Sequence, residues 1–310
     1  MKHQISVALC TCNGAAYIGH QIASILNQSA LVDEIIVCDD SSTDSTMAIV
    51  NDYARRAVVP IRCHVNEPRL GVCANFDRAI GLCSGDIVFL SDQDDIWLPE
   101  KVEKTIEWFD SHEDKEVVFS NGYYMDDDEK AFTSRQMFDA VGFTAKARRL
   151  FDKGFQMEAL LPHNRATGAA MALRKSFVNQ LSLDRLAAAH DKEILHDYAI
   201  VLAAASVQQL GYISQPLIRY RIHKGQQQGF GEWLAKPPTT SNLLKPRKFA
   251  DEKLDYIFPG AKSRALFYRE RREFRNLLSR WKVLAHLDEY KRYYGENYLM
   301  VFFYDLFYCF

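Results

Sequence analysis

The feature that most constrains the fold is an alternation of short apolar runs and helical patterns across the first third of the chain. The apolar runs lie at residues 5–9, 34–40, 61–66 and 86–91, and the segments with helical spacing lie at residues 17–27, 45–56, 72–82 and 99–109. Strands and helices that alternate in this way predict right-handed βαβ units and a parallel sheet. The runs are continuously apolar, which is typical of strands covered by helices on both faces. We therefore predict an α/β fold.

The part of the chain after Val117 has a less regular pattern. We expect a strand at residues 117–121, a strand leading into a helix at 165–176, an apolar helix at 196–206 and two short strands around Pro216. Residues 126–155 are polar and irregular, and Asp126–Asp128 within them predict a solvated turn without a ligand.

Composition and charge narrow the class of protein. A chain of 310 residues with 48% hydrophobic content is ample for a full core, and a net charge of -2 gives no overall attraction to nucleic acid or to an anionic membrane. Seven cysteines, an odd number lying mostly in apolar runs, favour a reducing, cytosolic setting. The sequence shows no signal-peptide pattern and no stretch with the length of a transmembrane helix. These features predict a cytoplasmic protein.

Three carboxylates, Asp92, Asp94 and Asp95, come directly after the apolar run that ends at Ser91. In open α/β sheets ligands bind outside the carboxyl ends of the strands, so we expect these side chains to face the ligand crevice. Crowded carboxylates repel one another unless a cation neutralises them. Mg²⁺ and Mn²⁺ prefer oxygen ligands and share them with substrate phosphates. The spacing therefore predicts a divalent metal site.

A second acidic segment, residues 39–44, follows the second apolar run. Its last part, residues 42–44, is explained as a helix cap. A helix cap does not explain Asp39 and Asp40, which precede it at the strand exit. A carboxylate at that position can accept a hydrogen bond from a base N–H or a ribose hydroxyl.

Two further motifs place ionisable side chains at the ends of expected elements. His196 and Asp197 precede an apolar helix, where Asp197 serves as an N-cap, as a general base, or as both. Arg221 and His223 end a strand, where they can hold pyrophosphate oxygens or the cation. The sequence contains no glycine-rich loop of the dinucleotide-binding or P-loop kind, which disfavours a dehydrogenase or a P-loop enzyme.

Five motifs in order resemble the inverting nucleotide-sugar glycosyltransferases of family 2. They are ISVALCTCNGAAYIGHQIASILNQ, EIIVCDDSSTDST, NEPRLGVCANFDRAIGLCSGDIVFLSDQDDIW, ATGAAMALRKS, and HDYAI together with YRIH, and they span roughly residues 4–225. The resemblance implies the GT-A fold, a Rossmann-like, mixed and mainly parallel sheet flanked by helices. SDQDDIW with HD and YRIH is similar to the bacterial rhamnosyltransferase-like branch, which implies a surface polysaccharide, O-antigen or capsule, as the product.

The resemblance also implies a role for each matching position. Asp197 would be the catalytic base; Thr11, Asn13, Asp39, Asp40, Asp92 and Arg221 would bind the nucleotide or donor; Asp92, Asp94 and His223 would hold the metal; and Asp95, Trp97 and His196 would face the sugar or the acceptor. Two positions depart from the family pattern. Cys12 stands where a larger or aromatic residue is common, and His196 replaces a frequent Glu, which leaves the donor preference open.

These roles imply a metal-dependent, inverting transfer of a sugar from dTDP-rhamnose or a UDP-sugar to a hydroxyl of a glycan acceptor, expected to be lipid-linked. The expected cofactor is Mn²⁺ or Mg²⁺, and no nucleic-acid partner is expected. The alternative function is an inactive GT-A domain that binds sugar nucleotides or assists assembly, which the intact Asp94 and Asp197 disfavour. A nucleotidyltransferase is disfavoured because the first loop lacks glycine-rich and basic character.

The expected organisation is a catalytic domain followed by a helical extension. The catalytic domain covers residues 1–230, with a nucleotide-binding half at 1–115 and an acceptor-binding half at 116–230, and the extension covers residues 231–310. The extension is basic and then strongly aromatic. We expect it to pack on the catalytic domain or on a second copy in a homodimer, or to contact the inner face of the cell membrane as a peripheral foot.

Overall fold

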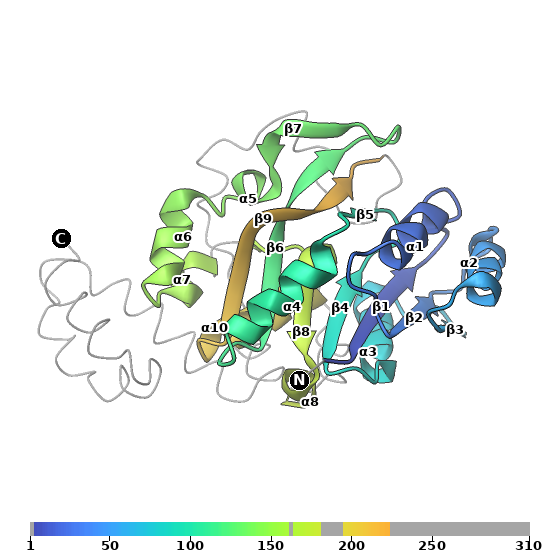
Figure 1. Ribbon diagram of the computed structural model, residues 1–310, viewed down its shortest axis with the longest axis horizontal. Helices are drawn as coiled ribbons and strands as arrows, with labels where there is room; N and C mark the ends of the chain where they lie inside the picture. Colours follow the sequence, from blue (N-terminus) through green and yellow to red (C-terminus); the bar gives the residue numbers. More distant parts are fainter. Residues whose placement is uncertain (1–2, 161–163, 181–194, 224–310) are drawn as a thin grey trace, which may run out of the picture.

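The computed structural model describes residues 3–160, 164–180 and 195–223, and within them the strands form one mixed sheet of nine strands (Figure 1). The strands are β1 (Ile5–Thr11), β2 (Glu34–Asp39), β3 (Ile61–Val65), β4 (Ile87–Ser91), β5 (Ile96–Trp97), β6 (Val117–Met125), β7 (Ala131–Gln136), β8 (Met171–Arg174) and β9 (Leu210–Arg221). Their order is β3-β2-β1-β4-β8-β6-β9-β5, with β7 paired to β6. β1 to β4 run parallel, whereas β8 is antiparallel to both β4 and β6. The expected mixed α/β sheet is confirmed.

Helices flank both faces of this sheet. They are α1 (Ile18–Leu26), α2 (Thr46–Arg56), α3 (Val72–Leu82), α4 (Lys101–Ser111), α5 (Met137–Ala140), α6 (Ala145–Asp152), α7 (Gln156–Leu160), α8 (Lys175–Gln180) and α10 (His196–Ser206), with a 3₁₀ turn, η1, at Gly168–Ala170. The four helices expected in the first third are α1 to α4, and the elements agree with the predicted bounds to within two residues.

The core lies on both faces of the sheet because successive side chains of a strand point in opposite directions. In β1, Val7 and Leu9 belong to one buried apolar cluster with Ile22 of α1. Ala8 and Cys10, which alternate with them, belong to a second cluster with Phe76 of α3. Burial on both faces explains why the run is continuously apolar.

The parallel strands end together at one edge of the sheet. Thr11, the last residue of β1, is level with Asp39 of β2, and Leu9 is level with Ser91 at the end of β4. The loops that leave these three strands therefore emerge side by side. This edge carries the polar side chains that the sequence places at the strand exits.

Two expectations for the second half of the chain were wrong. A single strand, β9, replaces the two short strands expected around Pro216, and it runs alongside β6 (Figure 1). The pairing shifts register where Asn121 is level with Pro216, because a proline has no N–H to donate to the ladder. Residues 126–155 contain β7, α5 and α6 rather than irregular chain, because apolar side chains such as Phe138 and Phe143 are buried in the core.

The helical extension expected at residues 231–310 lies outside the described residues. In the part of the chain that is described, no helix is both long and apolar enough to cross a bilayer. The division of the catalytic domain after residue 115 stays a prediction. The sheet itself is continuous across that point, since β6 pairs with β8 and β8 pairs with β4.

Candidate functional site

A cavity of about 600 Å³ opens at the edge of the sheet where β1, β2 and β4 end. The predicted site residues that line it are Thr11, Asn13, Asp40, Asp92, Asp94, His196, Asp197 and His223. The predicted site residues that do not line it are Asp39, Asp95, Trp97 and Arg221. The fold thus gathers predicted site residues from four of the five motifs at one place.

The exit of β4 contributes two carboxylates to the cavity. Burial, together with the negative charges of Asp94 and Asp197, raises the pKa of Asp92 to about 8, and the ammonium of Lys101 opposes this rise. Asp92, Asp94 and Asp197 therefore lie close enough to repel one another, and Lys101 offsets this repulsion only in part. Such a region favours the binding of a further positive charge.

Asp94 is paired with the predicted third metal ligand. Its Oδ2 lies 2.9 Å from Nε2 of His223, and the imidazole of His223 packs against the ring of Tyr17 with centroids 4.6 Å apart. β9 carries His223 from its C-terminal end to the carboxylates that follow β4, although 129 residues separate the two side chains in the sequence.

The donor set fits a divalent cation that is shared with a substrate. Among the described residues, no three His, Cys, Asp or Glu side chains form a closed metal cage. Mg²⁺ is typically bound by one or two carboxylates plus substrate phosphates, and Mn²⁺ also suits oxygen ligands, so a closed cage is not required. Asp92 and Asp94 supply that number, and the uncompensated charge around Asp92 agrees with a cation there.

Asp197 enters the cavity from the first turn of α10. Its Oδ2 accepts a hydrogen bond from the backbone N–H of Gly168 at 3.2 Å, and its Oδ1 accepts one from the N–H of Tyr198 at 2.7 Å. A Cβ on residue 168 would lie 3.2 Å from the Cβ of Asp197, so glycine allows the η1 turn to approach closely. The carboxylate is thus fixed in direction while its remaining lone pairs are available to a ligand.

His196 stands beside Asp197 in an apolar setting. Its ring stacks on Phe76 with centroids 4.0 Å apart, and neither ring nitrogen has a hydrogen-bond partner among the described residues. Burial lowers the pKa of His196, and the charge of Asp197 opposes this, so a neutral imidazole is favoured at neutral pH. A neutral ring with unmatched nitrogens is suited to a hydroxyl, which can both donate and accept.

The loop after β1 is held by a residue that the sequence interpretation missed. Gln93, in the middle of the acidic motif, accepts hydrogen bonds through Oε1 from Thr11 Oγ1 at 2.6 Å and from the N–H of Cys12 at 2.8 Å. Asn13 in turn accepts a hydrogen bond from the N–H of Thr43 at 2.8 Å. The exits of β1, β2 and β4 are therefore joined into one polar wall. An amide between two predicted metal ligands was the available signal for Gln93.

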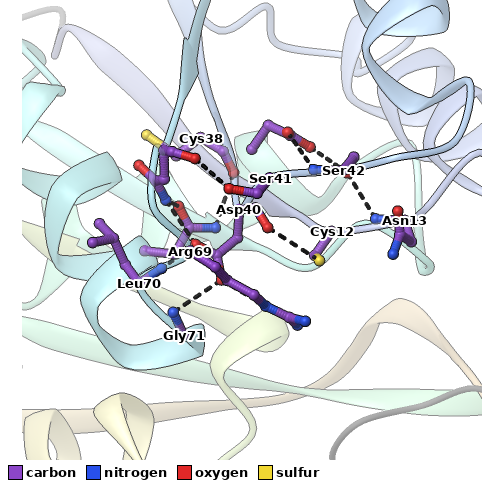
Figure 2. Close-up of polar contacts among 12 residues, drawn as sticks. Cys12, Asn13, Cys38, Asp40, Ser41, Ser42, Arg69, Leu70 and Gly71 are labelled. Carbon is purple, nitrogen blue, oxygen red and sulfur yellow. Dashed lines mark hydrogen bonds and ion pairs between the residues drawn. The ribbon is translucent and has the colours of Figure 1, made fainter.

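Asp40 is occupied by the protein itself (Figure 2). Its two oxygens accept hydrogen bonds from Asn66 Nδ2 at 3.0 Å, Leu70 N at 2.7 Å, Gly71 N at 2.9 Å and Arg69 Nε at 3.3 Å. Burial alone would raise its pKa, but these donors lower it, so Asp40 is a carboxylate at neutral pH. Four donors fill the usual capacity of a carboxylate. In this conformation Asp40 orders the loop that presents Arg69 to the cavity.

Asp39 also serves the local backbone. It is fully buried, and its Oδ2 accepts a hydrogen bond from the N–H of Ser42 at 2.9 Å. This contact shapes the loop that follows β2 and keeps Asp39 out of the cavity lining. Its expected contact with the nucleotide stays a prediction that this conformation does not support.

Arg221 lies inside the protein rather than on the cavity wall, because its guanidinium is used up by internal partners. It is 1% exposed, and its Nε donates to the carbonyl of Asp94 at 2.7 Å. Its Nη1 donates to the carbonyls of Asp126 and Asp127, and its Nη2 contacts Glu129 at 3.0 Å. These bonds clamp the β6–β7 turn to the end of β4. The expected contact of Arg221 with pyrophosphate stays a prediction that this conformation does not support.

Replacing Arg221 by Met is expected to lower the free energy of unfolding by about 3 kcal/mol, because buried carbonyls and Glu129 lose their donors. Chemical denaturation would measure this. Arg219→Met is the matched control, since Arg219 lies on the same strand but is only half-buried. A loss no larger than that of the control would contradict the clamp.

The acidic turn at Asp126–Asp128 lies beside the cavity, whereas we expected it to be surrounded by solvent. Asp127 lines the cavity, and its Oδ1 accepts a hydrogen bond from Tyr17 Oη at 3.0 Å. The contacts with Arg221 bring this turn to the site. The local sequence does not distinguish this turn from one that is exposed to solvent, because the residues that it contacts, Tyr17 and Arg221, lie far away in the sequence.

Asp95 and Trp97 are buried next to the site without lining the cavity. Asp95 Oδ1 accepts a hydrogen bond from the N–H of Arg221 at 3.0 Å, and the Trp97 ring packs against Phe89 with centroids 5.5 Å apart. Their expected contact with sugar or acceptor stays a prediction, and this conformation does not place either side chain where it would touch a ligand.

Comparison with known proteins gives a consistent picture. Residues 6–180 match the model of glycosyl transferase family 2. The chain is 28% identical over 230 residues to the dTDP-rhamnosyl transferase RfbG of Shigella flexneri, which covers 71% of this chain and 73% of that protein. It is 30% identical over 115 residues to the putative glycosyltransferase EpsE of Bacillus subtilis, which covers 37% of this chain and 41% of EpsE. The chain thus spans less than half the length of EpsE and of several other relatives.

Solved structures share the fold. TarS 1-349 of S. aureus, crystallised with UDP-GlcNAc, has a TM-score of 0.53 and 15% identity, over 97% of this chain and 87% of that one. The mannosyltransferase PcManGT of Pyrobaculum calidifontis, in complex with GDP-Man and Mn²⁺, has a TM-score of 0.50 and 15% identity, over 98% of this chain and 84% of that one. At these identities the likeness concerns the fold alone.

Proposed function

Because the chain belongs to glycosyl transferase family 2, we propose that its cavity binds a nucleoside diphosphate sugar and transfers the sugar, with inversion, to a hydroxyl of a glycan. The observation that carries this proposal is that Asp197 opens into the same cavity as Asp92 and Asp94. A carboxylate that can accept a proton thus lies in the same pocket as two carboxylates that suit a cation, which in turn can hold a diphosphate.

The nucleotide is proposed to lie along the wall formed by the β1 and β2 exits. Thr11 and Asn13 line the cavity there, and Arg69 adds a cation that Asp40 orients through Nε. A guanidinium held at Nε still presents its outer nitrogens, which suit a base carbonyl, a ribose hydroxyl or a phosphate oxygen.

The diphosphate is proposed to lie at the β4 exit. Asp92 and Asp94 would hold Mn²⁺ or Mg²⁺ there, with His223 beside Asp94. The ion, when bound, supplies positive charge against the negative charge that builds on the leaving diphosphate. Two proteins of similar fold agree with this proposal. PcManGT was crystallised with GDP-Man and Mn²⁺, and TarS 1-349 was crystallised with UDP-GlcNAc.

The proton of the acceptor hydroxyl is proposed to pass to Asp197. The Gly168 N–H holds Oδ2 at 3.2 Å, so the carboxylate has a fixed direction, and a positioned general base contributes typically 10²–10⁴-fold. Attack on the anomeric carbon from the face opposite the diphosphate inverts the configuration in one displacement. A single catalytic carboxylate is enough for this reaction.

The sugar is proposed to be a deoxyhexose such as rhamnose, carried on dTDP, with a UDP-sugar as the alternative. The cavity wall near Asp197 is partly apolar: Val72 and Phe76 lie one turn apart on α3, and Phe76 stacks on His196. Such a wall suits a methyl group better than a hydroxymethyl group. The similarity to RfbG, a dTDP-rhamnosyl transferase, points the same way. The acceptor is proposed to be a lipid-linked glycan of O-antigen or capsule synthesis in the cytoplasm.

A panel of dTDP, UDP and GDP, each with and without Mn²⁺, tests the proposal by thermal melting. We expect dTDP or UDP to stabilise the full chain only with metal, by about 2.7 kcal/mol at a hundred times the dissociation constant. Sugar transfer from the donor of that nucleotide should follow. Binding without any transfer would favour the inactive domain that binds sugar nucleotides. No stabilisation by any nucleotide would contradict the transferase and favour the inactive domain that assists assembly.

A further inference from the structure

The first residue of α4, Lys101, is a buried ion that the proposed mechanism does not use. Its side chain is 1% exposed, and lysine is almost never fully buried unless its charge is compensated. The compensating charges belong to Asp95 and Asp92. Burial lowers the pKa of Lys101 to about 7, and these two carboxylates oppose the decrease. A lysine buried in this way invites a functional explanation.

The contacts of Lys101 lead to the proposed base. Its Nζ donates a hydrogen bond to the carbonyl of Ala169 at 2.7 Å and lies over the Trp97 ring, 4.2 Å from the centroid. Ala169 is the middle residue of the η1 turn, whose first residue, Gly168, donates its N–H to Asp197 at 3.2 Å. One side chain thus ties α4 to the turn that orients Asp197.

We propose that Lys101 is a positioning residue that holds the Gly168–Ala170 turn, and through it Asp197, in the orientation needed for proton transfer. This inference rests on the proposed function, because it assigns a purpose to the orientation of the base. It predicts a loss of turnover that passes through Asp197, because the two contacts of Lys101, Ala169 and the Trp97 ring, lie outside the cavity lining.

The test replaces Lys101 by Met in the full chain and measures transfer and nucleotide binding separately. We expect kcat to fall by about 30-fold, since a displacement of about 1 Å can cost 10²-fold. The donor KM and the melting shift produced by nucleotide with Mn²⁺ should stay within about threefold and about 1 °C of the parent. Lys175→Met is the matched control. Lys175 also begins a helix and donates to a backbone carbonyl, that of Ile80 at 2.9 Å, but lies outside the cavity lining.

The deciding arm adds Lys101→Met to an Asp197→Asn chain. If Lys101 acts through Asp197, the residual turnover changes by less than about threefold, because coupled residues are not additive. A further drop of about 30-fold would overturn the inference, as would a single variant that keeps the parent turnover. Lys101→Gln keeps a hydrogen-bond donor for Ala169 and should retain more turnover than Lys101→Met. If the Met variant does not fold, Lys101→Gln is used in its place, both alone and combined with Asp197→Asn. Absence of transfer by the parent chain would instead overturn the proposed function, and this inference with it.

Discussion

The Asp197→Asn variant is expected to lose about a thousandfold in turnover number while still binding the nucleoside diphosphate. Asn keeps the size of the side chain and can still accept the hydrogen bond from Gly168, but it cannot take up the proton of the acceptor hydroxyl. Release of nucleoside diphosphate at saturating donor and acceptor measures the turnover. The melting shift with nucleotide and Mn²⁺ measures binding, which should be unchanged within about 1 °C.

Asp52→Asn is the control for this substitution. Asp52 lies on α2 outside the cavity lining, and its exposed ion pairs with Arg55 and Arg56 contribute little to stability. Its turnover should stay within about twofold of the parent. If Asp197→Asn keeps more than about a tenth of the parent turnover, the base is a different group. His196, the other titratable side chain at the start of α10 in the cavity, would then be the first to test.

The Asp94→Asn variant is expected to lose the metal-dependent part of nucleotide binding and about a hundredfold or more in turnover. Asp94 and Asp92 are the carboxylates that follow β4 into the cavity, and an amide cannot neutralise a cation as a carboxylate does. Thermal melting with nucleotide, with and without Mn²⁺, measures the effect. The stabilisation of about 2.7 kcal/mol expected for the parent should fall below about 1 kcal/mol.

Asp114→Asn is the control for the metal site, because Asp114 is exposed and pairs only with Lys115 among the described residues. It should keep the full metal-dependent shift. Chelation of the metal from the parent chain should reproduce the melting behaviour of Asp94→Asn. An unchanged shift in Asp94→Asn would mean that the cation binds elsewhere, and equal shifts in the parent with metal and with chelator would mean that the nucleotide binds without it.

Local patterns were enough to predict the first half of the fold. α3 begins and ends at Val72 and Leu82, as its apolar spacing predicts, because a helix is defined by contacts between residues three and four apart. The strands β1, β2 and β4 follow from continuous apolar runs that are buried on both faces of the sheet, whereas the edge strand β3 is only partly buried. The position of the cavity follows as well, since parallel strands that end together direct Thr11, Asp40 and Asp92 to one edge.

The second half of the fold was predicted less well because its elements depend on distant partners. β9 remains one strand through Pro216 because β6 supports it on both sides of the register shift. The β6–β7 turn comes to the cavity because Arg221 holds it, across 95 residues of sequence. Neither interaction produces a periodic sequence pattern in the segment that it stabilises, β9 or the β6–β7 turn.

The sequence by itself determined which residue types gather at the strand exits, and therefore that carboxylates, amides and imidazoles share one pocket. Only the tertiary structure decided which of them are free to meet a ligand. Asp40 and Arg221 look like ligand-binding residues in the sequence, yet their hydrogen-bonding capacity is taken up by Leu70, Gly71 and the carbonyls of a distant turn. Hydrogen-bond capacity is limited and is satisfied by whichever donors and acceptors the fold brings near, so the assignment of each polar side chain to scaffold or to site is settled by contacts across the whole chain.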